Sequence, residues 1–187
     1  MCKQIITLIL LLAFNNLNAQ TDEKIINEIL FDLFGLQQDK ILIENVKTKT
    51  HFEYDSVSFE NMTGLTIPSK IITEWKRNEE CHDSSAEWNE QELNKIDTLF
   101  LEDDTVIGKK PVFKCLTKDK IDQLFEKTKK RQKIYSISKI LFDNSKENAI
   151  FHLVTIPWPG DFYSETILIK KVFGKWKIIE RFDFSMT

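Results

Sequence analysis

The sequence predicts an α+β fold, in which an N-terminal amphipathic helix and short helices pack on a C-terminal antiparallel β-meander of about four or more strands. Apolar residues over residues 22–34 recur with the spacing of one helical face. β-rich runs with short polar connections fill the chain from residue 134 onward. Those connections are too short for the crossover that parallel strands need. Because no linker interrupts the chain, we expect a single domain over residues 20–187.

Residues 1–19 have the features of a secretory signal peptide that is removed on export. Lys3 precedes the apolar residues 5–14, and Ala19 supplies the small residue expected before a cleavage site. An apolar run of this length is too short to span a bilayer, which takes roughly twenty residues. We therefore expect an exported protein, periplasmic or secreted, with no membrane span after leader cleavage.

The first helix is predicted over residues 22–34 by its apolar stripe and by its end signals. Thr21 is expected to be the N-cap, and Gly35 stands where a C-cap glycine belongs. Residues 41–60 then alternate loosely between apolar and polar side chains, which predicts one or two strands. A helix followed by extended chain is thus expected at the start of the domain.

Short helices are predicted in the middle of the chain. Pro68 can begin a helix, because its fixed φ suits the first turn. The charged residues 76–83 that follow predict a solvated loop. Ser84 and Glu87 have the spacing of a capping box, which predicts another short helix toward Leu93.

The second half of the chain is predicted to be mostly strands. Residues 98–101 predict a strand, and Thr117 is a plausible N-cap for a helix over residues 118–130. A two-residue hairpin is expected at residues 174–175. The four β-rich runs of the predicted meander are residues 134–142, 149–156, 165–173 and 176–184. We expect the helices of the first part to cover one face of the resulting sheet.

Two patterns within the meander resemble known proteins. Residues 135–142 contain a Ser-x-x-aliphatic-Phe strand, and residues 174–178 read Gly-Lys-Trp-Lys-aliphatic. This combination resembles a pattern in uncharacterised exported bacterial proteins, and the resemblance implies a structural meander without a known activity. The order of a helix followed by a long meander is also similar to cystatin-like folds, including nuclear-transport-factor-2-like domains. Such folds include enzymes, ligand binders and scaffolds, so this similarity implies no function.

Composition restricts the classes of partner. The chain is 42% hydrophobic and contains 14 phenylalanines and 4 tryptophans, which indicates a folded protein rather than a disordered one. Its formal net charge of −3 provides no electrostatic attraction to nucleic acid or to an anionic membrane. We therefore expect an unidentified ligand, glycan or protein as the partner, and neither nucleic acid nor a cofactor.

Cys81 and Cys115 are expected to form a disulfide. Cys2 leaves with the leader, and the remaining pair would reach an oxidising compartment. The bridge would close a loop of about 35 residues and stabilise the fold by roughly 3–4 kcal/mol in the chain-entropy description. Two buried free thiols are the alternative.

Residues 79–83 contain several types of metal ligand or nucleophile, namely two glutamates followed by Cys81, His82 and Asp83. Consecutive side chains rarely converge on one ion, and no second cluster with metal-ligand spacing accompanies them. A disulfide at Cys81 would also remove its thiolate chemistry. We therefore expect no metal and no catalytic residue here.

His152 and Glu180 are the candidates for acid–base chemistry. His152 lies among apolar residues of its predicted strand, and Glu180 is expected on the same face as Trp176. Polar groups on apolar faces must be hydrogen-bonded or paired, and such places often hold perturbed acids and bases. The alternative is structural, because a turn at residues 174–175 makes Lys171 and Glu180 diagonal neighbours that can form an ion pair.

The connection over residues 157–163 is the strongest candidate for a binding site. Its two prolines stiffen a surface loop that contains Trp158, Asp161, Phe162 and Tyr163. Exposed, rigid aromatic side chains are favoured anchors for a protein partner or for stacking on a sugar ring. The alternative is that Trp158 and Phe162 fold back and plug the open end of the sheet.

The leading hypothesis is therefore an exported, non-enzymatic domain that binds a ligand or partner through the 157–163 loop. The first alternative is a small periplasmic hydrolase that uses either His152 and Glu180 or the cluster at Cys81, His82 and Asp83. The second alternative is an envelope-associated structural scaffold. The absence of a nucleophile elbow or a phosphate-binding loop favours the binding hypothesis.

Overall fold

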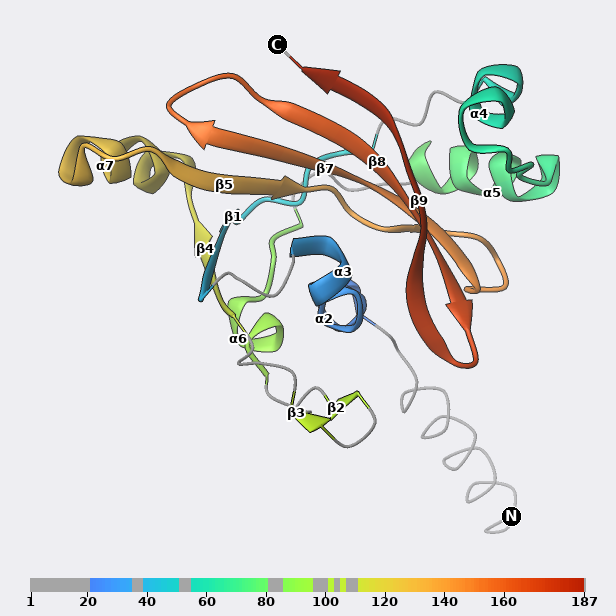
Figure 1. Cartoon of the computed structure of the whole chain (residues 1–187), viewed down its shortest axis with the longest axis horizontal. Helices are drawn as coiled ribbons and strands as arrows, with labels where there is room; N and C mark the ends of the chain where they lie inside the picture. The colour runs from blue at the N-terminus through green and yellow to red at the C-terminus, as the bar shows by residue number, and fades with distance from the viewer. Residues whose placement is uncertain are drawn as a thin grey trace, which may run out of the picture.

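The computed structural model places helices on both faces of a mixed β-sheet (Figure 1). It describes residues 21–34, 39–50, 55–80, 86–95, 101–102, 105–106 and 111–186. The helices are α2 (Asp22–Glu28), α3 (Leu30–Phe34), α4 (Ser56–Thr63), α5 (Ser69–Glu80), α6 (Glu90–Leu93) and α7 (Lys118–Thr128). The strands are β1 (Lys40–Glu44), β2 (Leu101–Glu102), β3 (Thr105–Val106), β4 (Val112–Leu116), β5 (Gln132–Ile137), β6 (Leu141–Phe142), β7 (Asn148–Trp158), β8 (Tyr163–Val172) and β9 (Lys175–Met186).

The sheet confirms the predicted α+β fold and its C-terminal antiparallel meander. Its strand order is β4-β1-β5-β7-β8-β9, and β6 pairs with β7 beside this path. The meander from β5 to β9 is antiparallel throughout, whereas β1 pairs in parallel with both β4 and β5. β2 and β3 form a separate antiparallel hairpin. The sheet is therefore mixed, with the predicted meander as its larger part.

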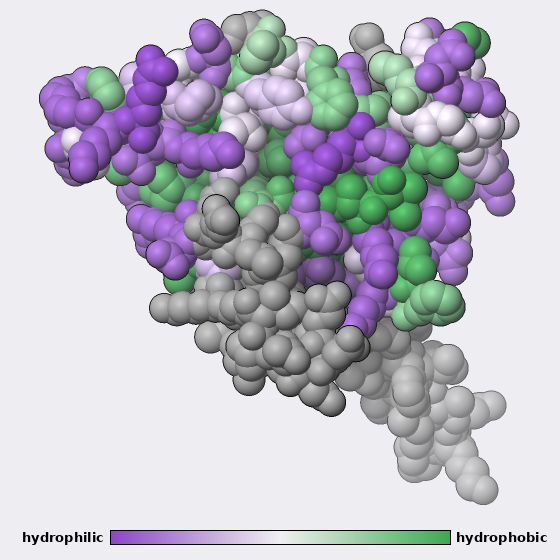
Figure 2. Space-filling view, viewed as in Figure 1, coloured by the Kyte–Doolittle hydropathy of each residue, from purple (hydrophilic) through white to green (hydrophobic). Residues whose placement is uncertain are grey.

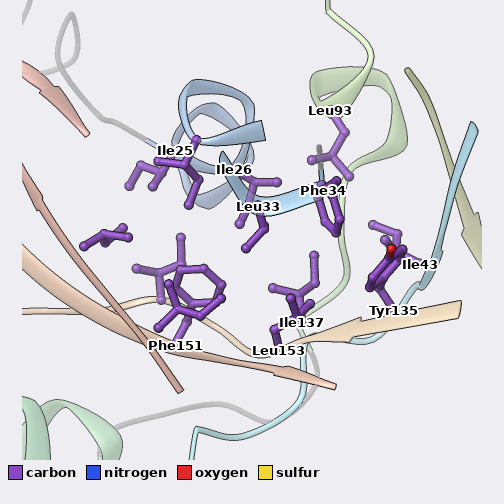
Figure 3. Close-up of a cluster of buried hydrophobic side chains, with 14 of the residues drawn as sticks. Ile25, Ile26, Leu33, Phe34, Ile43, Leu93, Tyr135, Ile137, Phe151 and Leu153 are labelled. Carbon is purple, nitrogen blue, oxygen red and sulfur yellow. The ribbon is translucent and has the colours of Figure 1, made fainter. Parts of the chain in front are cut away.

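The main core lies on the face of the sheet that α2, α3 and α6 cover, which we call the first face. Figure 3 shows side chains from α2 and α3 pointing toward those of the strands. Every second residue of a strand, such as Phe151 and Leu153 in β7, contributes its side chain to this core from the sheet. The cluster comprises Ile25, Ile26, Ile29, Leu33, Phe34, Ile41, Ile43, Trp88, Leu93, Phe113, Tyr135, Ile137, Ile140, Ala149, Phe151, Leu153, Ile167, Ile169 and Trp176.

The opposite, second face of the sheet is covered near its two ends. At one end, α4 and α5 contribute Phe59 and Trp75 to a cluster with Ile150 of β7. At the other end α7 contributes Ile121 to a cluster that includes Ile134. The expectation that helices cover one face is therefore wrong. Consecutive strand residues are apolar, so both faces of the sheet must be buried.

The outer surface of α7 is mainly hydrophilic, and hydrophobic residues gather where β9 crosses the view in Figure 2.

The first predicted helix is present but divided. α2 ends at Glu28, and α3 begins at Leu30, with Ile29 as the C-cap residue between them. Thr21 is the N-cap as predicted, since its side-chain oxygen accepts a hydrogen bond from the Lys24 amide over 3.4 Å. Gly35, the predicted C-cap, lies outside the described residues.

Residues 41–60 contain one strand and one helix, whereas their alternation predicts one or two strands. β1 confirms the first strand, but residues 56–63 form α4. Asp55 caps this helix, because its carboxylate accepts a hydrogen bond from the Val57 amide over 3.0 Å. Gly64 ends it with a φ of 69°, which suits glycine. These end signals override the strand-like alternation of the apolar residues, and residues 51–54 lie outside the described part of the chain.

The middle helices differ from their predicted bounds. α5 starts after Pro68 as predicted but continues to Glu80, so residues 76–80 are helical instead of a loop. α6 begins after Asn89, whose side-chain oxygen accepts hydrogen bonds from the Gln91 and Glu92 amides. The predicted capping box is wrong, because Glu87 forms a β-bridge with Val46. The helix after Thr117 is confirmed.

The β8–β9 turn differs from the predicted hairpin by one residue. Phe173 and Gly174 form the turn with φ angles of 50° and 81°, and Val172 pairs with Lys175. Lys171 therefore lies opposite Trp176 instead of Ile178, with its Nζ 5.8 Å from the Trp176 ring. The predicted register is wrong, and the diagonal arrangement proposed for Lys171 and Glu180 is absent.

Phe151 provides a test of the main core. It is fully buried on the first face, whereas Phe173 is fully exposed in the β8–β9 turn. We expect Phe151→Ala to lower the free energy of unfolding by about 3–5 kcal/mol, because it leaves a cavity. The matched change Phe173→Ala should alter it by less than about 0.5 kcal/mol. Urea unfolding of both variants measures this, and equal losses would contradict the assignment of the core.

Candidate functional site

A cleft of about 560 Å³ opens on the first face near the loop that joins β7 to β8. Its floor is the sheet itself. Tyr135 of β5, Thr155 of β7 and Tyr163 of β8 pair across these strands, so their side chains form one row. Leu153 and Glu165 form the next row, because they are also cross-strand partners. Three neighbouring strands thus supply both hydroxyl groups and apolar surface.

The walls of the cleft come from opposite sides. α3 contributes Leu33 and Phe34, and the Phe34 ring meets the Tyr135 ring edge-on at a centroid distance of 4.7 Å. Figure 3 shows these two residues of α3 directed toward the sheet. The β7–β8 loop contributes Asp161 and Phe162. The cleft therefore lies between a helix and a loop, over a sheet floor.

The β7–β8 loop turns tightly at Gly160. A Cβ atom at this position would lie 2.8 Å from the carbonyl oxygen of Pro157, which is closer than Cβ atoms approach other atoms. Glycine therefore lets the chain fold back toward β8. This turn brings Asp161 and Phe162 to the side of the cleft, where Phe162 is 40% exposed.

A partly buried ion pair lies at the junction of floor and wall. Arg181 of β9 donates through Nη1 to Glu165 Oε1 over 2.8 Å, and the Glu165 side chain is only 6% exposed. Arg181 Nη2 donates to the main-chain carbonyl of Asp32, at 2.5 Å, and to that of Leu33. These carbonyls belong to the last turn of α3, which lacks intrahelical donors. The guanidinium group therefore links β8, β9 and α3.

Tyr163 retains its proton at neutral pH. Burial and the neighbouring negative charge of Glu165 both raise the pKa of its hydroxyl above the ordinary value. Its ring is stacked on Phe184 at a centroid distance of 5.9 Å. The hydroxyl group is therefore a hydrogen-bond donor at the cleft.

The predicted loop residues do not all reach the cleft. Asp161, Phe162 and Tyr163 line it, whereas Trp158 packs against the apolar cluster on the second face beneath α7. Trp158 is thus partly buried on the second face, whereas Phe162 is exposed at the cleft surface, so the two rings do not act together as either interpretation expected. Successive residues of β7 point to opposite faces, which explains why Pro157 and Trp158 separate.

The structure places His152 and Glu180 away from the cleft. His152 shares the second face with Ile150, and its Nδ1 is 2.9 Å from Thr166 Oγ1. Glu180 lies opposite Leu168 on that same face, so the expectation that it shares a face with Trp176 is wrong. A β-bulge at Ile179 causes this change of face. His152 and Glu180 are on strands separated by β8 and in different rows.

Of the two cysteines that were expected to pair, the structure describes Cys115. Cys81, His82 and Asp83 lie outside the described residues, and the disulfide therefore stays a prediction. Cys115 is half-buried, and the pKa of its thiol form is raised to about 11, first by burial and then by the charge of Glu90. Within the described ranges, no group of three or more His, Cys, Asp or Glu side chains could hold a metal ion.

Sequence reasoning missed most of the floor and the helical wall. Glu165 and Arg181 were not singled out, although an acid within a buried β-rich run requires a partner. Tyr135, Thr155 and Leu33 gave no signal of their own, because only strand register and helix packing bring them together. The loop residues were found because aromatic side chains in a proline-containing connection are recognisable locally.

The chain matches no protein-family model, and neither curated proteins nor solved structures gave a match. The resemblance of the meander to exported bacterial proteins and the similarity to cystatin-like folds stay predictions. Among the helices that the structure describes, none has the length and apolar character needed to cross a membrane. The site must therefore be interpreted from its own geometry.

Cys115 should react slowly in the folded protein. At pH 8, a thiol with a pKa of about 11 instead of 9.0 holds roughly a hundredth of the thiolate. We expect iodoacetamide to modify Cys115 about 100-fold more slowly in folded Cys81→Ser protein than in the urea-unfolded variant, as followed by intact mass. Equal rates would contradict the buried position of the thiol.

Proposed function

We propose that the protein is an exported, non-enzymatic domain that binds a small ligand in the cleft beside the β7–β8 loop. The observation that carries this proposal is that Asp161, Phe162 and Tyr163 line one continuous cleft with α3 and the sheet. Its volume of about 560 Å³ is within the usual range of small-molecule sites. The geometry supports binding of a small molecule better than binding of a flat protein surface, because the aromatic residues face a concavity.

The chemistry of the lining supports binding rather than catalysis. The cleft combines apolar and aromatic walls with a few polar groups, which is the usual composition of a ligand site. The lining residues include no His, Ser or Cys, so neither a Ser–His nor a Cys–His pair is present among them. Glu165, the buried carboxylate of the floor, is held by Arg181.

The alternatives receive less support from the described residues. A hydrolase that used His152 and Glu180 would work from the second face, where their side chains occupy different rows on separate strands. A scaffold function would give the cleft no role. The cleft and its exposed Phe162 therefore favour the ligand-binding function over both.

Phe162→Ala tests the proposed function. We expect binders from a library of small organic molecules and short glycans, detected by ligand-observed NMR, to lose about tenfold in affinity, since truncating an aromatic anchor costs about 1–2 kcal/mol. Phe173→Ala makes the same chemical change in the β8–β9 turn at the other end of the strand, and it should leave binding unchanged.

The free energy of unfolding separates loss of contact from loss of fold. Phe162 is partly exposed, so Phe162→Ala should change stability by less than about 0.5 kcal/mol. Binding that is identical in the two variants and in the parent protein would contradict a site at this loop. Unfolding of the Phe162→Ala variant alone would assign the ring to the core instead.

A further inference from the structure

The charged groups of the cleft fall into a compensated pair and two remaining ions. Glu165 and Arg181 neutralise each other, and Arg181 also holds the carbonyl groups of α3. Lys133 and Asp161 line the cleft as well, and neither takes part in an ion pair among the described residues. A ligand therefore meets one cation and one acid whose charges are still available.

Three hydrogen-bond donors belong to neighbouring positions of the cleft lining. Thr155 and Tyr163 are direct cross-strand partners, and Lys133 is diagonal to Thr155, because it pairs with Pro157. Diagonal neighbours are within reach of a long side chain. The Lys133 Nζ lies 5.5 Å from the centre of the Tyr135 ring, which places its charge over the floor.

Acceptor oxygens suit this arrangement best. Lys133 offers only donors, and the Tyr163 hydroxyl group, which is protonated at neutral pH, can donate as well. Thr155 can donate through its hydroxyl group. The acid of the cleft, Asp161, is on the exposed loop rather than on the floor, so water weakens its effect on a bound anion. The floor is thus selective for a negatively charged group.

The walls require an apolar body on the same ligand. Leu33, Phe34 and Phe162 face the cleft from α3 and from the loop, and Met186 borders it at the end of β9. A small polar anion would leave the exposed surfaces of Phe162 and Met186 in contact with water. A neutral apolar molecule would bury the donors of the floor without partners, which is costly.

Resting on the function proposed above, we propose that the ligand is an amphipathic carboxylate. Its acid group is bound by Lys133, Thr155 and Tyr163. Its apolar body lies between α3 and Phe162. The Glu165–Arg181 pair borders the site as a neutral element, because its two charges are already satisfied.

Four probes with the same alkyl chain test this proposal by isothermal titration calorimetry: decanoate, decyl phosphate, 1-decanol and decylammonium, each below its micelle concentration. We expect decanoate to bind at least about tenfold more tightly than decanol or decylammonium, which corresponds to about 1.4 kcal/mol. Decyl phosphate distinguishes a carboxylate from a phosphate ester. Tighter binding of the phosphate would overturn the carboxylate assignment.

Lys133→Met removes the charge and keeps an apolar stem. It should weaken decanoate binding about tenfold and leave decanol binding unchanged. Lys177→Met is the matched control, because Lys177 is an exposed lysine of β9 outside the cleft lining. Its affinity for decanoate should equal that of the parent protein.

The outcomes separate the ligand class from the function. Equal affinities for decanoate and decanol, or an unchanged affinity in Lys133→Met, would overturn the carboxylate and leave the binding cleft intact. If no decyl probe binds while library compounds bind in a manner that depends on Phe162, the ligand class alone is wrong. If Phe162→Ala changes no binding at all, the proposed function falls together with this inference.

Discussion

The β-bulge in β9 is the constraint on which the candidate site depends. The pairing of β8 with β9 shifts between Leu168 and Ile169, which leaves Ile179 as an extra residue. An extra residue reverses the alternation of side chains, because strand residues point to opposite faces in turn. Arg181 therefore projects on the first face, beside Glu165. With unbroken alternation, the guanidinium group would lie on the second face and the buried carboxylate would lose its cation.

The resulting ion pair shapes the cleft more than it stabilises the fold. Burying two charges costs desolvation free energy, which their attraction offsets only in good geometry, but removing one partner leaves a buried charge uncompensated. Arg181 also donates to the last carbonyls of α3, so the same group holds the helical wall over the floor. Because Glu165 and Arg181 neutralise each other, the charges with which a ligand can interact are those of Lys133 and of Asp161 on the loop. The proposed ligand class thus follows from the bulge.

Local signals predicted the parts of the fold that depend on local chemistry. Thr21 and Thr117 cap helices as expected, and the antiparallel meander follows from its short connections. The helix after Asp55 was missed because its apolar residues also fit a strand, whereas the cap decides the outcome. The parallel pairing of β1 with β4 and β5 joins segments far apart in the chain, and no local pattern encodes it. The alternation of residues in β9 likewise does not mark the bulge at Ile179, so the side chains of the floor could not be predicted from alternation.

Hydrogen exchange of α3 tests most directly whether Arg181 holds the cleft together. The Leu33 amide donates to the Ile29 carbonyl over 2.8 Å, and the Ile121 amide of α7 provides a reference far from the ion pair. Arg181→Met keeps the apolar stem and removes the guanidinium group. The account predicts that exchange at Leu33 accelerates at least about tenfold relative to Ile121, because α3 loses its tether to the sheet. An unchanged ratio of the two exchange rates would contradict it.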